Sequence, residues 1–321
     1  MQPKHRITVL TPTYNRKDLL GRVYQNLIDQ TYKDFVWLII DDGSIDGTDT
    51  VVAKWQSENT IDIKYIHKTN EGKHKALRQG FLMADTPYLV DFDDDDQYTP
   101  DCLETYMREW DKIESEGRMD IGSIRALVAN EDGSICGNVA DSIVGSSSYD
   151  SDYIEENFNK NKRFENITSF KLSAVRDADI FRFPEEWMSR KLKFVSECIF
   201  WSRLACKYKT RYVMKPLRIY NNNSIGITRT SGGNGYAPKW TSTCYSNIVF
   251  MNEMDDYYKT HLVNAIKSLV LTSTYSIGAR LPYIKVMSEI NSLIFRLVAY
   301  LLYPVGWILN NYLKFVKKKT F

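Results

Sequence analysis

Residues 89–101 read LVDFDDDDQYTPD, a short apolar run that passes directly into a row of carboxylates and then into a helix start at Thr99-Pro100-Asp101. Asp91 and Asp93 to Asp96 put five carboxylates within six residues. Like charges at this density repel, and hard oxygen ligands in a short turn suit Mg²⁺ or Mn²⁺ as the compensating cation. A solvated acidic loop is the alternative. The stretch predicts a strand, a ligand-binding turn and a helix, an arrangement found at the carboxyl edge of open α/β sheets.

Strands and helices alternate on both sides of this stretch. Apolar runs with β character occupy residues 7–11, 35–40, 61–66, 87–92 and 121–128. Helical spacing occurs at residues 17–30, 48–58, 73–84 and 100–115, with Asp46 or Thr48 and Thr99 as helix caps. This order predicts an α/β protein with a mostly parallel central sheet flanked by helices.

The chain then becomes more varied. Asp132-Gly133 is a hairpin signal, and SSSYDSD at 146–152 is typical of a mobile loop. Later segments predict a strand at 165–172, an amphipathic helix at 194–207, and two closing strands, TRYVM (210–214) and PLRIY (216–220). A Gly/Ser/Asn-rich stretch, 221–235, separates this part from the rest, so we expect two domains, 1–228 and 229–321.

Composition narrows the class of protein. The 42 basic and 40 acidic residues give a formal charge of +2, so no global field favours nucleic acid as a partner. The five cysteines are odd in number and have no metal-ligand spacing, which indicates free thiols in a reducing compartment. The first residues, MQPKHRITVL, have neither the apolar run nor the cleavage site of a secretory signal. We therefore expect the catalytic part to be cytoplasmic.

The C-terminal region has a different character. Helices are expected at 240–278 and 283–316. The apolar run Leu297 to Leu309 is thirteen residues long and contains Pro304 and Gly306, whereas a perpendicular span needs about twenty. The favoured interpretation is an amphipathic tail, about 285–321, lying on the inner face of the cell membrane, with aromatic residues at headgroup level and lysines near anionic lipid. The alternatives are a helix packed on the globular domain or on a second subunit, as in a homodimer, and a true span.

Four motifs in this order resemble the family 2 glycosyltransferases. They are TPTYNR (11–16), IIDDGSIDGT (39–48), NEGKHKALRQG (70–80) and DFDDDDQYTPD (91–101). The resemblance covers residues 6 to about 225. It implies an inverting enzyme of the GT-A fold, Rossmann-like, that uses nucleotide-diphosphate sugars. Residues 1–128 would then be the half that binds the nucleotide sugar, residues 129–228 the acceptor half, and the remainder a helical extension.

The first two motifs have features of a nucleotide pocket. Pro12 is expected to end its strand, so that Tyr14, Asn15 and Arg16 project at the sheet edge, where an aromatic ring and a cation suit a base and a diphosphate. A proline turn with Asn15 capping the next helix is the alternative. Carboxylates can accept the N–H of a uracil ring, and the resemblance gives this role to Asp41 and Asp42, with Asp42 favoured.

The other two motifs concern the diphosphate and the metal. The resemblance places Gly72, Lys73 and, less directly, His74 in the donor pocket, beside a helix N-terminus that favours anions. Aligning YTPD with the family pattern makes Asp95 the metal ligand, with Asp93 near the ribose or the metal and Asp94 in the donor site. A slip of two residues gives these roles to Asp91 and Asp93, and alternating side-chain directions in a strand leave both frames open.

The acceptor half needs a general base. Glu197, which opens the amphipathic helix expected at 194–207, is the predicted base, and Glu185 and Glu186 are second choices. Many relatives have a histidine after the last strand, where this chain has Tyr220 and Asn222. Cations that remain available to the diphosphate are Arg218 and Arg229, with Ser224 as a further polar contact.

The leading prediction is a metal-dependent inverting glycosyltransferase. It would move a sugar from a nucleotide donor, with UDP favoured, to a saccharide or lipid-linked acceptor of surface polysaccharide biosynthesis by a single displacement. Mn²⁺ or Mg²⁺ would be the cofactor. One alternative is a noncatalytic sugar-nucleotide binding or scaffolding subunit. Another is a nucleotidyltransferase, although TPTYNR does not resemble the phosphate loop of that class.

Overall fold

The computed structural model describes residues 4–137, 143–159, 165–182, 195, 197–221 and 236–318. By internal contacts the chain forms two compact units, Met1–Arg182 with Trp201–Gly226 and Phe183–Phe200 with Ile227–Phe321. Several residues named above lie outside the described residues: Glu185, Glu186, Asn222, Ser224 and Arg229, together with most of the stretch 221–235.

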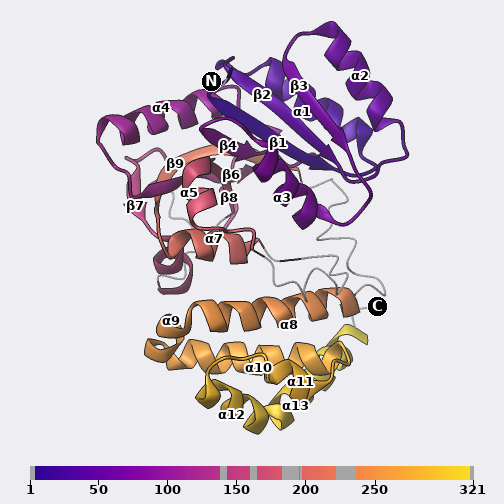
Figure 1. Cartoon of the computed structure of the whole chain (residues 1–321), viewed down its shortest axis with the longest axis vertical. Helices are drawn as coiled ribbons and strands as arrows, with labels where there is room; N and C mark the ends of the chain where they lie inside the picture. Colours follow the sequence, from indigo (N-terminus) through magenta and orange to yellow (C-terminus); the bar gives the residue numbers. More distant parts are fainter. Residues whose placement is uncertain are drawn as a thin grey trace. The chain divides into compact units, whose positions relative to one another are not determined.

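The first unit is built on one nine-stranded sheet with the order β3-β2-β1-β4-β8-β6-β9-β5, and β7 pairs with β9 (Figure 1). The strands are β1 (Ile7–Thr13), β2 (Phe35–Asp41), β3 (Asp62–His67), β4 (Tyr88–Asp91), β5 (Gln97–Tyr98), β6 (Ile121–Asn130), β7 (Tyr149–Ser151), β8 (Asn166–Lys171) and β9 (Lys209–Tyr220). Strands β3, β2, β1 and β4 are mutually parallel, as are β6 and β9, whereas β8, β5 and β7 are antiparallel to their neighbours. The predicted α/β class with a mostly parallel central sheet is confirmed.

The helices of this unit are α1 (Lys17–Ile28), α2 (Thr48–Glu58), α3 (Lys73–Met83), α4 (Cys102–Ser115) and α5 (Leu172–Asp177), with a short π-helix at Glu155–Asn159. Helix α7 (Cys198–Ala205) is divided between the two units after Phe200. Each of the first four connects consecutive strands, as the sequence predicted. Helix α1 buries Leu20, Val23 and Leu27, which share one helical face. Tyr24 of the same helix stacks with Trp55 of α2 and Trp37 of β2. The core thus anchors the parallel strands whose carboxyl ends carry the four motifs.

Pro12 does not end β1, contrary to the prediction. The strand continues to Thr13, and Pro12 pairs with Ile40 of β2. The carbonyl of Leu10 accepts a hydrogen bond from the amide of Phe92, so residues 10 and 12 both turn their polar backbone groups toward β4. Because β4 ends at Asp91, the missing N–H of Pro12 falls where no ladder bond is needed.

Two predictions in the later part of this unit are also wrong. The segments 210–214 and 216–220 form one strand, β9, with shifts of register opposite β6 between Val213 and Arg218, and Pro216 is accommodated in this irregular part. The predicted mobile loop contains β7, in which Asp150 accepts hydrogen bonds from Arg118 and Arg211. The predicted turn at Asp132-Gly133 is confirmed, since Gly133 has φ +85° and the amide of Asn130 donates to the carbonyl of Ser134.

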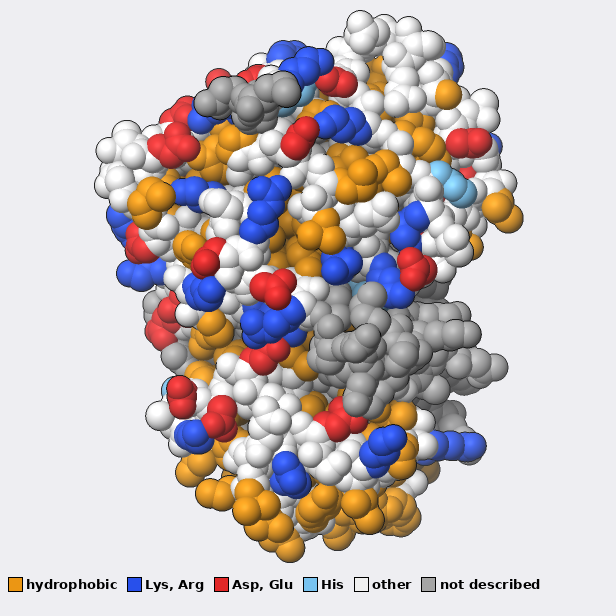
Figure 2. All heavy atoms as spheres, in the orientation of Figure 1, with side chains coloured by type: hydrophobic (Ala, Val, Ile, Leu, Met, Phe, Trp, Pro, Cys, Tyr) orange, Lys and Arg blue, Asp and Glu red, His pale blue; other side chains and the backbone are white. Residues whose placement is uncertain are grey.

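The second unit is helical, as predicted, but the prediction that it consists of two long helices is wrong. It contains α8 (Tyr236–Glu253), α9 (Asp255–Thr260), α10 (Leu262–Gly278), α11 (Tyr283–Met287), α12 (Leu293–Leu301) and α13 (Tyr303–Lys318). The first predicted helix breaks at Met254 and His261, and the second breaks at 288–292 and at Leu302. Pro304 lacks the N–H that would continue α12, which accounts for the last of these breaks. Among the described residues, no single helix has the length and apolarity of a membrane span; α12 and α13 reach them only as a pair bent by 56°. Hydrophobic side chains gather over these two helices (Figure 2).

Close packing of α3 on β1 generates a stability prediction. A Cβ at Gly80 would lie 2.3 Å from Cδ1 of the buried Leu10. Gly80→Ala should therefore lower the free energy of unfolding by about 1–3 kcal/mol through overpacking, although alanine gains about 1 kcal/mol in helix propensity. Urea denaturation measures the change.

Gly21→Ala in α1 is the matched control, because its Cβ would find its nearest neighbour, Trp55, at 4.0 Å. This variant should be as stable as the wild type or more stable by up to about 1 kcal/mol. Equal stability of the two variants would contradict the packing described.

Candidate functional site

The loops after β1, β2 and β4 meet at one edge of the sheet, because these parallel strands are neighbours. The hydroxyl of Thr13 at the end of β1 donates to Asp94 Oδ2 at 2.9 Å. The amide of Asn15 donates to Ser44 Oγ, and Asn15 Oδ1 accepts the amide of Ile45, both at 2.8 Å. The first, second and fourth motifs are therefore bonded to one another, as expected for the carboxyl edge of an α/β sheet.

Asn15 holds the first loop in an unusual conformation. Its φ of 52° lies in the left-handed region, which asparagine tolerates better than most residues. Its side chain bridges to the second loop, and the amide of Lys17 at the start of α1 donates to Asp46 Oδ2 instead. The alternative in which Asn15 caps α1 is therefore wrong. Tyr14 is left 47% exposed at the edge, so its ring is open to a flat ligand.

Asp41 and Asp42 are buried acceptors with internal partners. Asp41 accepts the amide of Ser44 and the hydroxyl of Tyr65, at 2.7 and 2.6 Å. Asp42 Oδ1 accepts the amide of Glu71 and pairs with Lys68, while Oδ2 accepts the amide of Gly72 at 2.7 Å. Each carboxylate oxygen can accept more than one donor, so these bonds leave capacity for a ligand N–H. Through these hydrogen bonds Asp42 links the second and third motifs.

Two glycines allow the second and third motifs to approach closely enough for these hydrogen bonds. Gly72, at φ +100°, is the residue before α3 and offers its amide to Asp42. Gly43, at φ +91°, would place a Cβ 3.0 Å from the amide nitrogen of Asn70. A side chain at either position would be strained, and at residue 43 it would also push the second and third motifs apart.

The acidic turn after β4 is neutralised by three cations from distant parts of the chain. Arg16 pairs with Asp94 at 2.7 Å and with Asp95 at 3.2 Å. Lys73, at the start of α3, pairs with Asp93 at 2.6 Å. Arg218, on β9, pairs with Asp96 at 3.1 Å and with Asp93 at 3.4 Å. The charge compensation that the sequence required is thus supplied in large part by the protein itself.

The carboxylates of this turn have shifted pKa values. Although burial opposes ionisation, the charges of Lys73 and Arg218 hold the pKa of Asp93 at about 2. Burial raises the pKa of Asp94 and that of Asp96 to about 6, against the opposing charges of Arg16 and Arg218. Burial likewise lowers the pKa of His74 to about 4, so His74 carries no charge near neutral pH. The cationic contribution at the start of α3 therefore comes from Lys73.

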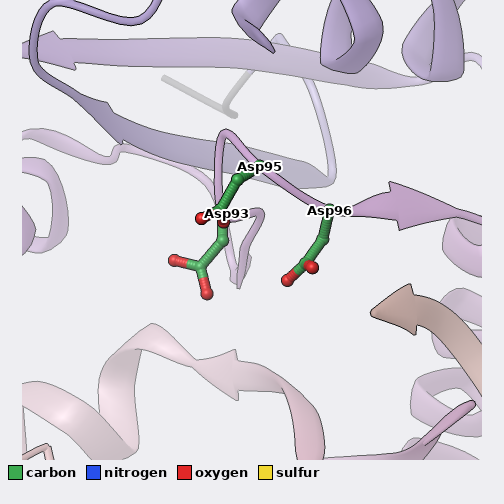
Figure 3. A group of neighbouring side chains, drawn as sticks. All are labelled: Asp93, Asp95 and Asp96. Atoms are coloured by element: carbon green, nitrogen blue, oxygen red, sulfur yellow. The ribbon is translucent and has the colours of Figure 1, made fainter. Parts of the chain in front are cut away.

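Three of these carboxylates suit a divalent cation. Oxygens of Asp93, Asp95 and Asp96 all lie within 4.8 Å of one another on the turn between β4 and β5 (Figure 3). Mg²⁺ and Mn²⁺ are commonly bound by a few carboxylate oxygens of a protein, and water and phosphate complete the coordination shell. This group contains both residues of the predicted pair Asp93 and Asp95, and it adds Asp96, which the sequence analysis did not single out as a ligand.

Arg218 is the residue whose role the sequence analysis understated. It was named only as a cation available to the diphosphate, whereas in the structure it is a buried partner of two aspartates. It reaches the turn because β9 pairs with β5, with Arg218 opposite Tyr98. A cation in an otherwise strand-like segment, LRIY, was the available signal, but the antiparallel pairing that aims it at the turn is a tertiary feature.

Glu197 immediately precedes α7, close to the predicted start of that helix, and its carbonyl accepts the amide of Phe200. It belongs to the second unit by contacts, whereas the aspartates belong to the first. Its role as general base stays a prediction.

Comparison with known proteins identifies the domain. Residues 8–119 match the model of glycosyl transferase family 2. A Campylobacter jejuni protein, described as GalNAc(5)-diNAcBac-PP-undecaprenol beta-1,3-glucosyltransferase, is 28% identical over 219 residues, or 67% of this chain and 64% of that protein. The uncharacterized glycosyltransferase YibD of Escherichia coli is 32% identical over 33% of this chain and 31% of its own. The chain thus spans less than two thirds of the length of these curated relatives.

Solved structures agree on the fold. Staphylococcus aureus TarS, residues 1–349 in complex with UDP-GlcNAc, matches with a TM-score of 0.57 at 16% identity, covering 94% of this chain and 89% of that one. The matched family model, the glycosyltransferase relatives and this shared fold agree with the resemblance predicted from the four motifs. Residues 8–119 are therefore identified as a family 2 glycosyltransferase domain, and the chain has the GT-A fold of this structural neighbour.

Proposed function

We propose that this protein transfers a sugar from a nucleotide-diphosphate sugar, with UDP favoured, to a saccharide or lipid-linked acceptor in surface polysaccharide biosynthesis. The observation that carries the proposal is the meeting of an acidic turn with Arg16, Lys73 and Arg218 at the carboxyl edge of the sheet. Two relatives support the choice of partners. The C. jejuni relative is named for an undecaprenol-linked acceptor, and TarS has been solved with UDP and with UDP-GlcNAc.

The donor would lie across the first three motifs. The exposed ring of Tyr14 offers a surface for the base, and Asp42 or Asp41 would accept a ring N–H from it. Asn15 and the end of β1 at Thr13 set the position of Tyr14, while Gly72 lets the start of α3 approach the ligand closely. Arg16 and Lys73 carry charge suited to the diphosphate.

The metal would be Mn²⁺ or Mg²⁺, held by Asp93 and Asp95 with Asp96 as a further oxygen donor. When bound, it supplies positive charge that stabilises the departing diphosphate. Asp93 is already paired with Lys73 and Arg218. If Asp93 turns to the metal, these two cations are left to pair with the diphosphate, so we expect metal and nucleotide to bind more tightly together than either does alone.

The transfer would be a single displacement that inverts the anomeric centre. A bond forms from the acceptor oxygen to the anomeric carbon while the bond from that carbon to the diphosphate oxygen breaks. The acceptor proton passes to a carboxylate, for which Glu197 is proposed. The diphosphate leaves with the electron pair of the broken bond.

We also propose that the protein works at the inner face of the cell membrane as a peripheral protein. A lipid-linked acceptor, as in the name of the C. jejuni relative, would be presented there.

The proposed base can be tested by Glu197→Gln. With the nucleotide sugar that gives the largest thermal shift, the variant should keep the donor affinity of the wild type, while turnover falls by about a hundredfold or more. Donor affinity is measured by calorimetry and turnover by release of nucleoside diphosphate. Glu131→Gln, at an exposed turn, is the control and should change neither.

A Glu197→Gln protein with normal turnover would remove Glu197 from the chemistry. If the wild type binds the donor but shows no turnover with any acceptor lipid or saccharide extract, the noncatalytic binding subunit becomes the better account.

The role of Arg218 as a built-in counter-ion generates a second prediction. Arg218→Met would leave Asp93 and Asp96 short of positive charge in a buried turn, so the free energy of unfolding in chelator should fall by about 3 kcal/mol. Added Mn²⁺ should restore part of the loss, because a dication replaces the missing charge. Urea denaturation with and without Mn²⁺ measures both effects.

Arg22→Met, at an exposed position of α1, should change stability by less than about 0.5 kcal/mol with or without metal. Arg218→Met with wild-type stability in chelator would show that the aspartates do not depend on Arg218.

A further inference from the structure

We propose that the second unit docks on an anionic lipid bilayer through one apolar face formed by α11, α12 and α13. We define this apolar face by its exposed side chains: Ile284, Leu293, Ile294, Leu297, Leu301, Val305, Trp307, Ile308, Tyr312 and Phe315. This deepens the proposed function, on which it rests only for the lipid-linked acceptor. It replaces the single amphipathic tail expected from the sequence by a surface that three short helices share.

The apolar face gathers ten exposed hydrophobic side chains on three short helices. Leu301 is 79% exposed and Ile308 is 62% exposed, and Figure 2 shows hydrophobic side chains in a continuous group over α12 and α13. Soluble proteins expose single apolar side chains freely, but contiguous groups of this kind mark a binding surface.

The inner side of these helices has the opposite character. Gly306 of α13 lies so close to α10 that a Cβ there would be 2.7 Å from Ser273 Cβ. Asn310 is buried and donates to the carbonyl of Thr274 at 3.2 Å. Helix α10 buries Thr272, Ser273, Thr274 and Ser276, and of these Ser273 and Thr274 lie against α13. At the contact between α13 and α10, small and polar residues thus pack inside while large apolar residues of α13 point outward, a pattern found in helices surrounded by lipid. Helices α11 and α12 instead bury apolar side chains, among them Met287 and Phe295.

Charge favours a bilayer over a second copy of this chain. Residues 283–318 contain five basic residues, Lys285, Arg296, Lys314, Lys317 and Lys318, and one acidic residue, Glu289. Two such faces brought together would repel, whereas anionic headgroups attract each lysine near the surface. The occupant that complements both the apolar side chains and the surrounding charge is an anionic membrane surface.

The geometry favours a peripheral position. Helices α12 and α13 bend by 56° at their junction, so they do not form a straight span. Trp307, Tyr303 and Tyr312 are amphipathic aromatic side chains of the kind that occupy the headgroup level. Between α11 and α12, an open groove of about 800 Å³ is lined by Tyr283, Tyr300 and Tyr303, with Lys285 at its wall. A lipid phosphate could reach Lys285 while its chain lies along the tyrosines.

The test is co-sedimentation of the full chain with vesicles of phosphatidylethanolamine and phosphatidylglycerol. The double variant L301D/I308D should bind these vesicles about tenfold or more weakly than the wild type, since it loses apolar contact and gains repulsion. The matched control L82D/M119D removes two apolar side chains of comparable exposure from the first unit and adds the same charge, and it should bind like the wild type. Circular dichroism melts of both variants check that they fold.

Two further measurements sharpen the result. Binding should weaken as salt rises and should be weaker to phosphatidylcholine vesicles. Lipids brominated in the acyl chains should quench tryptophan fluorescence of the wild type more than that of Trp307→Phe.

Equal binding of L301D/I308D and the wild type to the vesicles would overturn the proposal. A second result would also overturn it: the wild type does not bind vesicles and is a dimer in solution, whereas L301D/I308D is a monomer. The apolar face would then join two copies of the chain. A thermal-shift assay with nucleotide sugars, done in detergent on L301D/I308D and the wild type, distinguishes this proposal from the proposed function.

If the wild type binds vesicles but no nucleotide sugar, the result contradicts the proposed function and leaves the membrane proposal standing.

Discussion

The partly buried ion-pair network around the turn after β4 is the constraint on which the site depends. Four consecutive aspartates could not be packed at a strand end without positive charge, and that charge comes from the loop after β1, the start of α3 and the last long strand. Each cation therefore fixes a different part of the fold to the same turn. The same network would allow an exchange of partners in the proposed complex. A dication would pair with the aspartates, and the diphosphate would pair with the cations that the aspartates release.

Much of this could be predicted from the sequence. The alternation of apolar runs and amphipathic segments placed β1 to β4 and α1 to α4 within two residues of their observed ends. Motif order also placed the loops that follow β1, β2 and β4 at one edge, because parallel neighbours end on the same side. What sequence reasoning missed depends on pairing between distant segments. It did not foresee that β9 would run unbroken past Pro216, or that β5 would hold Arg218 against Asp93 and Asp96.

The C-terminal half shows a different limit. Hydrophobic periodicity predicted helices here, and Pro304 was an available signal for a helix break. The face that each helix exposes, however, depends on the helix against which it packs. In the sequence Gly306 is noticed only because it interrupts an apolar run, and Asn310 is not noticed at all, yet their contacts with α10 turn Trp307 and Ile308 away from that helix. The small and polar contact between α13 and α10 is thus a tertiary feature on which the proposed membrane face depends.

The central claim is that the acidic turn binds a dication together with a nucleotide diphosphate. It is tested most directly by calorimetric titration of Mn²⁺ into chelator-treated protein, with and without saturating UDP, for the wild type and for D93N/D95N. We expect one Mn²⁺ site in the wild type, at least about tenfold tighter with UDP present, and no such site in the double variant. Equal Mn²⁺ binding by the wild type and D93N/D95N in the presence of UDP would contradict the account.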